Sequence, residues 1–128
     1  MKPLTLEWIE KADGDFATAG REIRARKHIN YDAVCFHSQQ CAEKYLKAIL
    51  QENGIQFGRT HNLIALLELI LPLQPEWKLQ KPNLENLTAF AVYVRYPGES
   101  TDKQTAKTAL ASCTQIRRFA RKMLGFVD

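Results

Sequence analysis

The stretch YDAVCFHSQQCAEKYLKAIL, residues 31–50, decides the fold class of this protein. Its apolar residues recur at three- and four-residue intervals, the period of an α-helix with a buried face. Four polar residues interrupt this pattern, and at about 100° per residue they fall within about 80° of one another. They are His37, Gln40, Lys44 and Lys47. The segment therefore predicts a buried helix with one polar stripe beside its core-facing side.

Further helical segments lie on both sides of this stretch. We expect helices over residues 6–26, 31–53 and 61–71, a short turn around Trp77, a fourth helix from Leu84 to about Arg95, and a last helix after Thr101. Five amphipathic helices joined mostly by short loops predict an all-α, antiparallel up-and-down bundle of four to five helices. The length suits a single domain over residues 1–128.

Local signals mark the ends of these helices. Gly54 should end the second helix in a left-handed conformation. The fourth helix should stop before Pro97, because the residue preceding a proline avoids the α region. Gln104 completes a capping box at the start of the last helix. The candidate N-caps of the first, third and last helices are Thr5, Thr60 and Thr101.

The composition is that of an ordinary globular protein, with 45% hydrophobic and 25% charged residues. Its net charge of +4 permits contact with an anionic partner without requiring one. The most apolar run, residues 63–73, is too short to span a bilayer and contains Glu68 and Pro72. No secretory signal is visible. We therefore expect a cytoplasmic protein with no membrane segment.

The cysteines and acidic residues predict neither a disulfide framework nor a metal site. An odd number of cysteines without a CxxC pair favours reduced, buried thiols. No pair of potential ligands has zinc-finger spacing. The chain also has no carboxylate cluster for Mg²⁺ and no glycine-rich phosphate loop, so we expect no metal, no cofactor and no transferase chemistry in this chain alone. The three cysteines are Cys35, Cys41 and Cys113.

The polar stripe has two interpretations. It is either a solvated helix edge on which lysines extend to water, or the donor-rich wall of a site for phosphate or nucleotide. His61, at the start of the third helix, and the pair Arg95 and Tyr96, at the end of the fourth, could converge on the same region. Their simpler roles are to serve those helix ends.

Three motifs in the chain resemble the HEPN domain family. They are FHSQQCAEKYLKAIL, then G followed by THNL, then YVRYPGE, and the opening WIEKADGDFATA is similar to the first helix of the family. The resemblance implies a four- to five-helix bundle that commonly forms homodimers. It also implies one of three roles: partner of a minimal nucleotidyltransferase in a toxin–antitoxin pair, metal-independent ribonuclease, or non-catalytic nucleotide-binding module. The matching positions are Phe36, Gln39, Gln40, Ala42, Glu43, Lys44, Leu46, Lys47, Ala48, Gly54, Thr60, His61, Leu63, Arg95, Tyr96 and Pro97.

Ribonuclease members of this family carry an arginine followed, after four to six residues, by a histidine. Counted from Arg95, the corresponding positions hold Ser100, Thr101 and Asp102, so the motif is not present there. A substitute would need His37 or His61 to meet Arg95 across a groove or a dimer interface. The candidate catalytic residues are therefore Arg95, His37 and His61, and whether this chain is an enzyme stays open.

Three hypotheses follow from the sequence. The first is a module that binds a nucleotide or nucleic-acid phosphate and works with a separately encoded nucleotidyltransferase, in the homodimer that the resemblance implies. The second is a metal-independent ribonuclease toxin with a displaced active site. The third is a purely structural dimerising partner protein. Under the first, the residues contacting nucleotide or phosphate are His37, Gln40, Lys44, Lys47, His61, Arg95 and Tyr96.

The chain also carries two basic clusters. The first lies at the expected end of the first helix, where the helix macrodipole favours cations, and comprises Arg21, Arg24, Arg26 and Lys27. A second cluster lies near the end of the last helix and forms one basic face that could touch RNA phosphates. A favourable helix end in a solvated helix is the simpler explanation, and it is the one we favour. That second cluster comprises Arg117, Arg118, Arg121 and Lys122.

Overall fold

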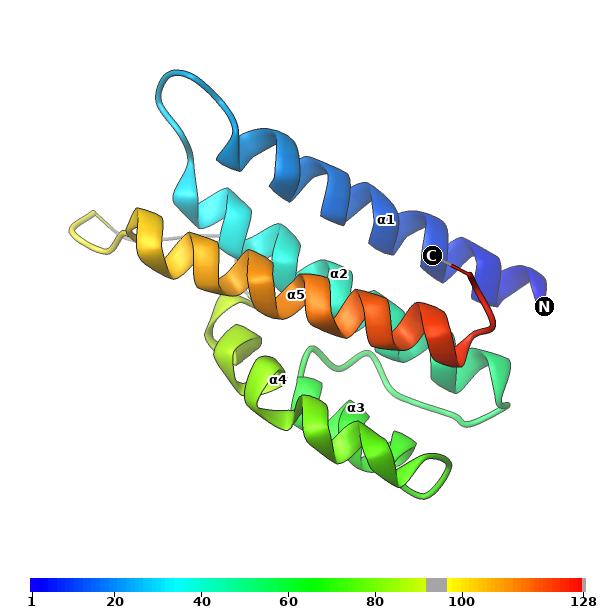
Figure 1. Ribbon diagram of the computed structural model, residues 1–128. Helices are drawn as coiled ribbons and strands as arrows, with labels where there is room; N and C mark the ends of the chain where they lie inside the picture. The colour runs from blue at the N-terminus through cyan, green and yellow to red at the C-terminus, as the bar shows by residue number, and fades with distance from the viewer. Residues whose placement is uncertain (92–96, 128) are drawn as a thin grey trace.

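The computed structural model of the protein describes residues 1–91 and 97–127. Within these ranges all regular structure is helical, which confirms the predicted all-α class (Figure 1). The α-helices are α1 (Pro3–Ile23), α2 (Tyr31–Glu52), α3 (Leu63–Ile70), α4 (Lys81–Leu87) and α5 (Lys103–Met123). Two 3₁₀ helices, η1 (Pro75–Gln80) and η2 (Thr88–Phe90), flank α4.

Helix α2 is the centre of the bundle, because it packs against α1, α3, α4 and α5. Helices α1 and α2 are antiparallel, because Lys2 contacts Glu52, Asp13 contacts Tyr45 and Asp15 contacts His37, in reverse order along the two helices. Contacts between α2 and α5 follow the same order along both helices. Thr101, just before α5, contacts Asp32 near the start of α2, and Arg121, near the end of α5, contacts Tyr45 farther along α2. Helices α2 and α5 therefore run in the same direction, as Figure 1 shows. The bundle forms as expected, but not every neighbouring pair of helices alternates in direction.

Several helix ends differ from the sequence prediction. Thr5 lies buried inside α1, which begins at Pro3. Asn62, not Thr60, caps α3 by accepting hydrogen bonds from two backbone N–H groups of its first turn. Asp102, not Thr101, caps α5 by accepting from the N–H of Thr105. At α3 and α5 an amide or carboxylate next to the helix displaces a hydroxyl as the capping acceptor, whereas Lys2, at the start of α1, makes no side-chain cap.

Other ends agree with the prediction. Gly54 follows α2 with a φ of +68°, the left-handed conformation expected of it. The turn around Trp77 is η1, and its indole is fully buried. The fourth helix differs from the prediction, because it begins at Lys81 instead of Leu84 and its α-helical part ends at Leu87 and continues as η2 to Phe90. The expected end near Arg95 and Tyr96 lies outside the described residues.

One hydrophobic core joins all the helices, and α2 supplies its largest share. The three cysteines are buried in it, as expected, and are unbridged. Cys41 on α2 lies beside Cys113 on α5, and burial raises the pKa of the Cys41 thiol, with the contact to Cys113 adding to the effect. Among the described residues, no helix is both long and apolar enough to cross a membrane.

Candidate functional site

The polar stripe of α2 faces α1 and the segment between α2 and α3. Two carboxylates meet it there, Asp15 from α1 and Glu43 from α2 itself, and both are buried. From the sequence, the stripe was expected to be either a solvated edge or a donor-rich wall. The structure instead brings each carboxylate into contact with one histidine and one lysine, so the stripe consists of two paired clusters.

The first cluster is centred on Asp15. Its Oδ1 lies 2.7 Å from Nδ1 of His37, and its Oδ2 accepts from Nζ of Lys44 at 2.5 Å. Use of Nδ1 by the carboxylate leaves Nε2 of His37 as the ring nitrogen available to another group. Lys44 is partly exposed, at 22% of its side chain, so its ammonium can still be reached from solvent.

The second cluster is centred on Glu43, which is 3% exposed. Its Oε2 accepts from Nζ of Lys47 at 3.1 Å, and its Oε1 lies 2.8 Å from Nδ1 of His61. Gln39 also donates to Oε1 at 3.1 Å, and Gln40 donates to the amide oxygen of Gln39 at 2.7 Å. Lys47 is itself buried, whereas the His61 side chain is 62% exposed. The carboxylate thus anchors an internal lysine on one side and orients an accessible imidazole on the other.

A groove of about 470 Å³ opens over the Glu43 cluster and reaches Lys44 of the Asp15 cluster. Gln40, Lys44 and Lys47 of α2 form its floor, and the segment after α2 forms one wall. Arg59, in that wall, is exposed and has no hydrogen-bonding or ionic partner within residues 1–91 and 97–127. We call this the basic groove. It is lined by Trp8, Gln40, Glu43, Lys44, Lys47, Phe57, Gly58, Arg59 and His61.

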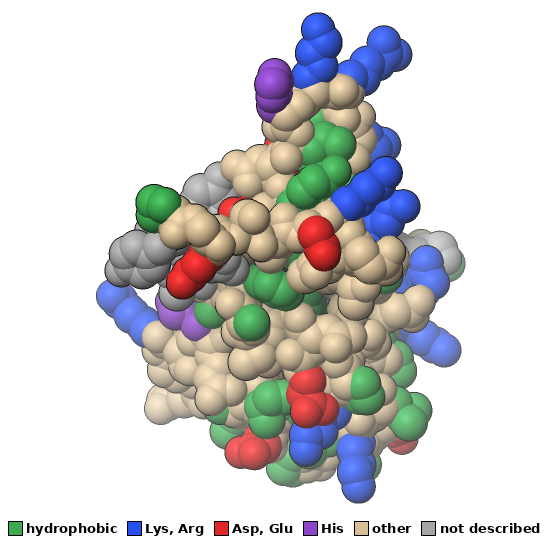
Figure 2. Space-filling model, turned by 90° about the vertical axis from the view of Figure 1, so that its left-hand side faces the viewer, with side chains coloured by type: hydrophobic (Ala, Val, Ile, Leu, Met, Phe, Trp, Pro, Cys, Tyr) green, Lys and Arg blue, Asp and Glu red, His purple; other side chains and the backbone are tan. Residues whose placement is uncertain are grey.

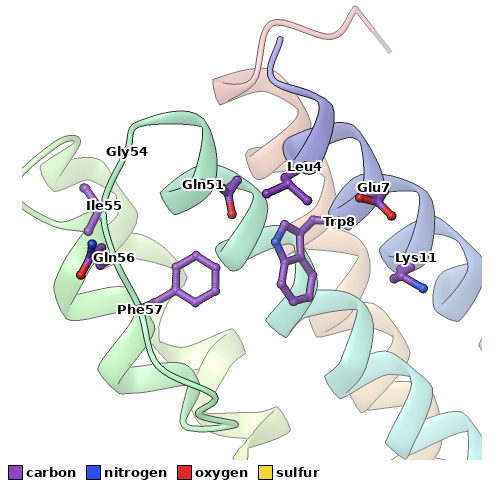
Figure 3. Close-up of a pocket in the computed structure, with 9 residues that line it drawn as sticks. All are labelled: Leu4, Glu7, Trp8, Lys11, Gln51, Gly54, Ile55, Gln56 and Phe57. Carbon is purple, nitrogen blue, oxygen red and sulfur yellow. The ribbon is translucent and has the colours of Figure 1, made fainter.

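A second hollow, of about 580 Å³, adjoins the first and is more apolar. Figure 3 shows it between the start of α1, the end of α2 and the segment that follows α2. Leu4 and Ile55 contribute apolar walls, and the amides of Gln51 and Gln56 stand at its edge. We call this the apolar groove. Glu7, Trp8, Lys11, Gly54 and Phe57 complete its lining.

Trp8 and Phe57 belong to both grooves and separate them. Their ring centroids lie 6.0 Å apart with the planes at 62°, an edge-to-face contact. The ammonium of Lys47 lies beneath the pair, 5.5 Å from the Trp8 ring and 5.9 Å from the Phe57 ring. A buried cation against two aromatic faces is stabilising. Lys47 therefore helps to hold the Trp8 and Phe57 rings in place.

The remaining candidates lie elsewhere. Arg95 and Tyr96 are outside the described residues. In the positions after them, Thr101 donates from its N–H and hydroxyl to Asp32, and Asp102 caps α5. Two of the three positions at which the ribonuclease motif would place its histidine therefore hold residues with structural roles.

The basic face expected near the end of α5 is divided by the fold. Arg117 and Arg121 turn toward α1 and contact Asp13 at 3.0 and 3.6 Å. Asp13 also accepts from the hydroxyl of the buried Tyr45. Arg118 and Lys122 stay exposed. The solvated-helix interpretation therefore describes half of this face, and the other half packs against α1.

Within the described residues, no group of three or more histidine, cysteine, aspartate and glutamate side chains is arranged to hold a metal ion. Chemistry at the grooves would use the imidazoles, the ammonium groups and Arg59. Sequence reasoning identified Gln40, Lys44, Lys47 and His61, which line the basic groove, and His37, which contacts Asp15 outside the groove lining. It missed the residues that organise them, which are Trp8, Asp15, Glu43, Phe57 and Arg59.

Comparisons with known proteins agree with this fold. The family model described as the HEPN domain matches residues 5–123. A protein of Methanocaldococcus jannaschii named "Putative toxin MJ1304" is 31% identical over 97 residues, covering 70% of this chain. The chain spans about 61% of the length of that relative. The crystal structure of ST0689, an archaeal HEPN homologue, aligns with a TM-score of 0.69 at 24% identity, covering 97% of this chain and 99% of that one, and shares the fold.

Proposed function

The chain belongs to the HEPN domain family, and on that premise we propose that it binds a nucleotide, or a nucleotide unit of RNA, across its two adjoining grooves. The observation that carries this proposal is the Trp8–Phe57 partition, which has an apolar hollow on one side and a cationic one on the other. A nucleotide has the same division, since a flat apolar base and an anionic phosphate are joined by a short sugar.

The base would occupy the apolar groove. Stacking of a base on an aromatic side chain contributes about 1–3 kcal/mol, and Trp8 and Phe57 present such rings there. Leu4 is 54% exposed at the groove mouth, so a planar ligand would cover apolar surface that water now touches. The amides of Gln51 and Gln56 can donate to and accept from the polar edge of a base.

The phosphate would occupy the basic groove. Arg59 is its principal ligand in this proposal, because it is exposed and no described residue neutralises it. A guanidinium also matches the geometry of phosphate oxygens. Lys44 would also contact the phosphate, although its ion pair with Asp15 partly neutralises its charge. Nε2 of His61 would donate a further hydrogen bond to a phosphate oxygen. Lys47 would act indirectly, since it is buried against Glu43.

We further propose that this HEPN chain works as one half of a toxin–antitoxin pair, with a separately encoded minimal nucleotidyltransferase, in the cytoplasm and as a single-domain homodimer. Two observations support the pairing. The relative from Methanocaldococcus jannaschii bears the name "Putative toxin MJ1304", and the described residues of this chain include no acidic metal cluster of the kind that transferase chemistry would use. The test is co-purification of both proteins from cells that express them together.

One contact supports a second candidate function, metal-independent RNA cleavage. Glu43 orients His61 through Nδ1 at 2.8 Å, the arrangement that prepares a histidine as a general base. His61 would take the proton of a 2′-hydroxyl, whose oxygen then attacks the adjacent phosphorus. The 5′-oxygen leaves and takes a proton from water, giving a cyclic phosphate. This predicts cleavage in EDTA that is lost in His61→Ala and retained in His28→Ala.

Thermal unfolding with added ligand tests the binding proposal. A ligand at about a hundred times its Kd stabilises by about 2.7 kcal/mol, which raises Tm by several degrees. We expect AMP to do so in the wild type and in Lys122→Ala, a control that removes an exposed cation on α5. The shift should disappear in Arg59→Ala. No shift with AMP, ATP or a short RNA would overturn the proposal, as would an unchanged shift in Arg59→Ala.

A further inference from the structure

The turn between α1 and α2 carries a concentration of positive charge. Residues 21–27 contain four Lys or Arg side chains and one carboxylate, Glu22, a formal charge of +3 in a chain whose total is +4. This turn projects beyond the rest of the bundle in Figure 1, and Figure 2 shows blue side chains gathered on the projection at the top of the molecule. We call it the basic tip and define it as Arg21, Arg24, Arg26 and Lys27.

The helix macrodipole accounts for only part of this charge. Helix α1 ends at Ile23, and the favourable effect on cations is confined to the last turn of a helix. Arg21 lies in that turn and Arg24 is the residue that follows the helix. Arg26 and Lys27 lie beyond it, where the dipole offers them nothing. Repulsion between these neighbouring cations destabilises the folded monomer, and no contact within the helix offsets it.

The folded chain does not neutralise the tip. The carboxylate of Glu22 accepts from the backbone N–H of Asn30 at 2.7 Å, so it fastens the turn to the start of α2. Arg26, Lys27 and His28 are exposed and have no side-chain partner in the part of the chain that the structure describes. His28 has a φ of +51°, a left-handed conformation uncommon for a residue with a side chain. The cations thus stand on an anchored turn with their charges open to solvent.

We propose that the basic tip docks the phosphodiester backbone of a nucleic acid. Three of its four permanent cations are arginines, whose planar guanidinium groups bind phosphate oxygens in pairs. The large hydrophobic side chains that are exposed elsewhere on the molecule do not include one from the tip. A membrane-inserting or protein-binding surface would present such anchors. A surface that carries positive charge but no exposed apolar side chain is suited to binding the phosphates of a nucleic acid.

The tip is separate from the two grooves. Trp8 and Arg24 are sixteen residues apart on or at the end of α1, roughly 24 Å at the helical rise. A mononucleotide in the grooves would not reach the tip, whereas a strand of RNA could contact both. The tip inference therefore goes beyond the proposed nucleotide site and can fail or succeed without it.

The test measures binding of a short fluorescent RNA by anisotropy between about 50 and 200 mM salt, where each phosphate contact on a single strand adds about 0.7 to the slope of log Kd against log salt. Arg26→Ala/Lys27→Ala removes two exposed charges from the tip. Arg118→Ala/Lys122→Ala removes two exposed charges from α5 and is the matched control. We expect the tip variant to lose about 1.4 in slope and at least about tenfold in affinity at the lowest salt, and the control to bind like the wild type.

Three results would overturn the inference. Equal weakening by the two double variants would assign the binding to net charge rather than to the tip. Wild-type affinity in the tip variant would remove the tip from the interface. Equally tight, tip-dependent binding of polyaspartate would assign the surface to acidic polypeptides. The AMP-induced thermal shift should persist in the tip variant, so loss of RNA docking there is distinguishable from loss of the nucleotide site.

Discussion

Replacing Lys47 with methionine should reveal a structural lysine. Its ammonium is buried, lies 3.1 Å from the Glu43 carboxylate and is stacked under two aromatic rings. Removing one partner of a buried ion pair costs about 3–5 kcal/mol because the other charge stays buried and unpaired. His61 and Gln39 still donate to Glu43, so we expect Lys47→Met to lose about 3 kcal/mol, near the lower end of that range.

Urea unfolding followed by circular dichroism measures this loss. With an m-value of about 2 kcal/mol/M, the midpoint should fall by about 1.5 M. Lys44→Met is the matched control: it is the same substitution on the same helix, but Lys44 is partly exposed, so it should lose only about 1 kcal/mol. Adding Glu43→Gln to Lys47→Met removes the unpaired charge and should recover most of the loss. If Lys47→Met loses less than about 1 kcal/mol while nucleotide binding disappears, Lys47 is a ligand contact and our reasoning is wrong.

Three further predictions concern the rest of the bundle. Gly54→Ala should lower the free energy of unfolding in urea by about 1–2 kcal/mol, because Gly54 has a φ of +68°, which is unfavourable for a residue with a side chain. An added Cβ would not clash with its surroundings, so this backbone cost is the whole effect. Gly54→Asn should lose less, and equal losses would contradict this. Burial, with the hydrogen bond to Asp13, raises the pKa of Tyr45, so its contribution to stability is full below about pH 10 and falls at higher pH. Stability should therefore decrease more steeply above that pH in the wild type than in Tyr45→Phe, and parallel curves would refute the assignment. The raised pKa of Cys41 and the burial of all three cysteines predict slow reaction with a thiol reagent in the native state and fast reaction in urea; fast native labelling would contradict it.

The fold was predictable because its main signal is local. The period of residues 31–50 identifies a buried helix, and similar patterns identify its neighbours. The errors lie where two capping residues stand close together, as Thr60 and Asn62 do. Thr101 was unavailable as a cap since its hydroxyl bonds Asp32, sixty-nine positions away. No local rule contains that contact. The parallel course of α2 and α5 is likewise a consequence of packing.

The candidate site was predictable in part. Helical spacing alone placed the stripe, and the same spacing puts Glu43 and Lys47 at i and i+4, a pair that the sequence could have revealed. The contact between Asp15 and Lys44 could not be foreseen, because it depends on how α1 is aligned against α2. The aromatic partition depends in addition on the path of the segment after Gly54, which brings Phe57 back onto α1.

The central claim is that a nucleotide places its base against Trp8. The chain has two tryptophans, and the indole N–H signals of Trp8 and Trp77 can be followed by NMR in ¹⁵N-labelled protein during titration with AMP. Trp77 is fully buried, with its N–H directed at the sulfur of Met123, and serves as an internal control. We predict that the Trp8 signal moves with AMP, moves much less with ribose 5-phosphate, and that the Trp77 signal stays in place. An unmoved Trp8 signal at saturating AMP would contradict the account.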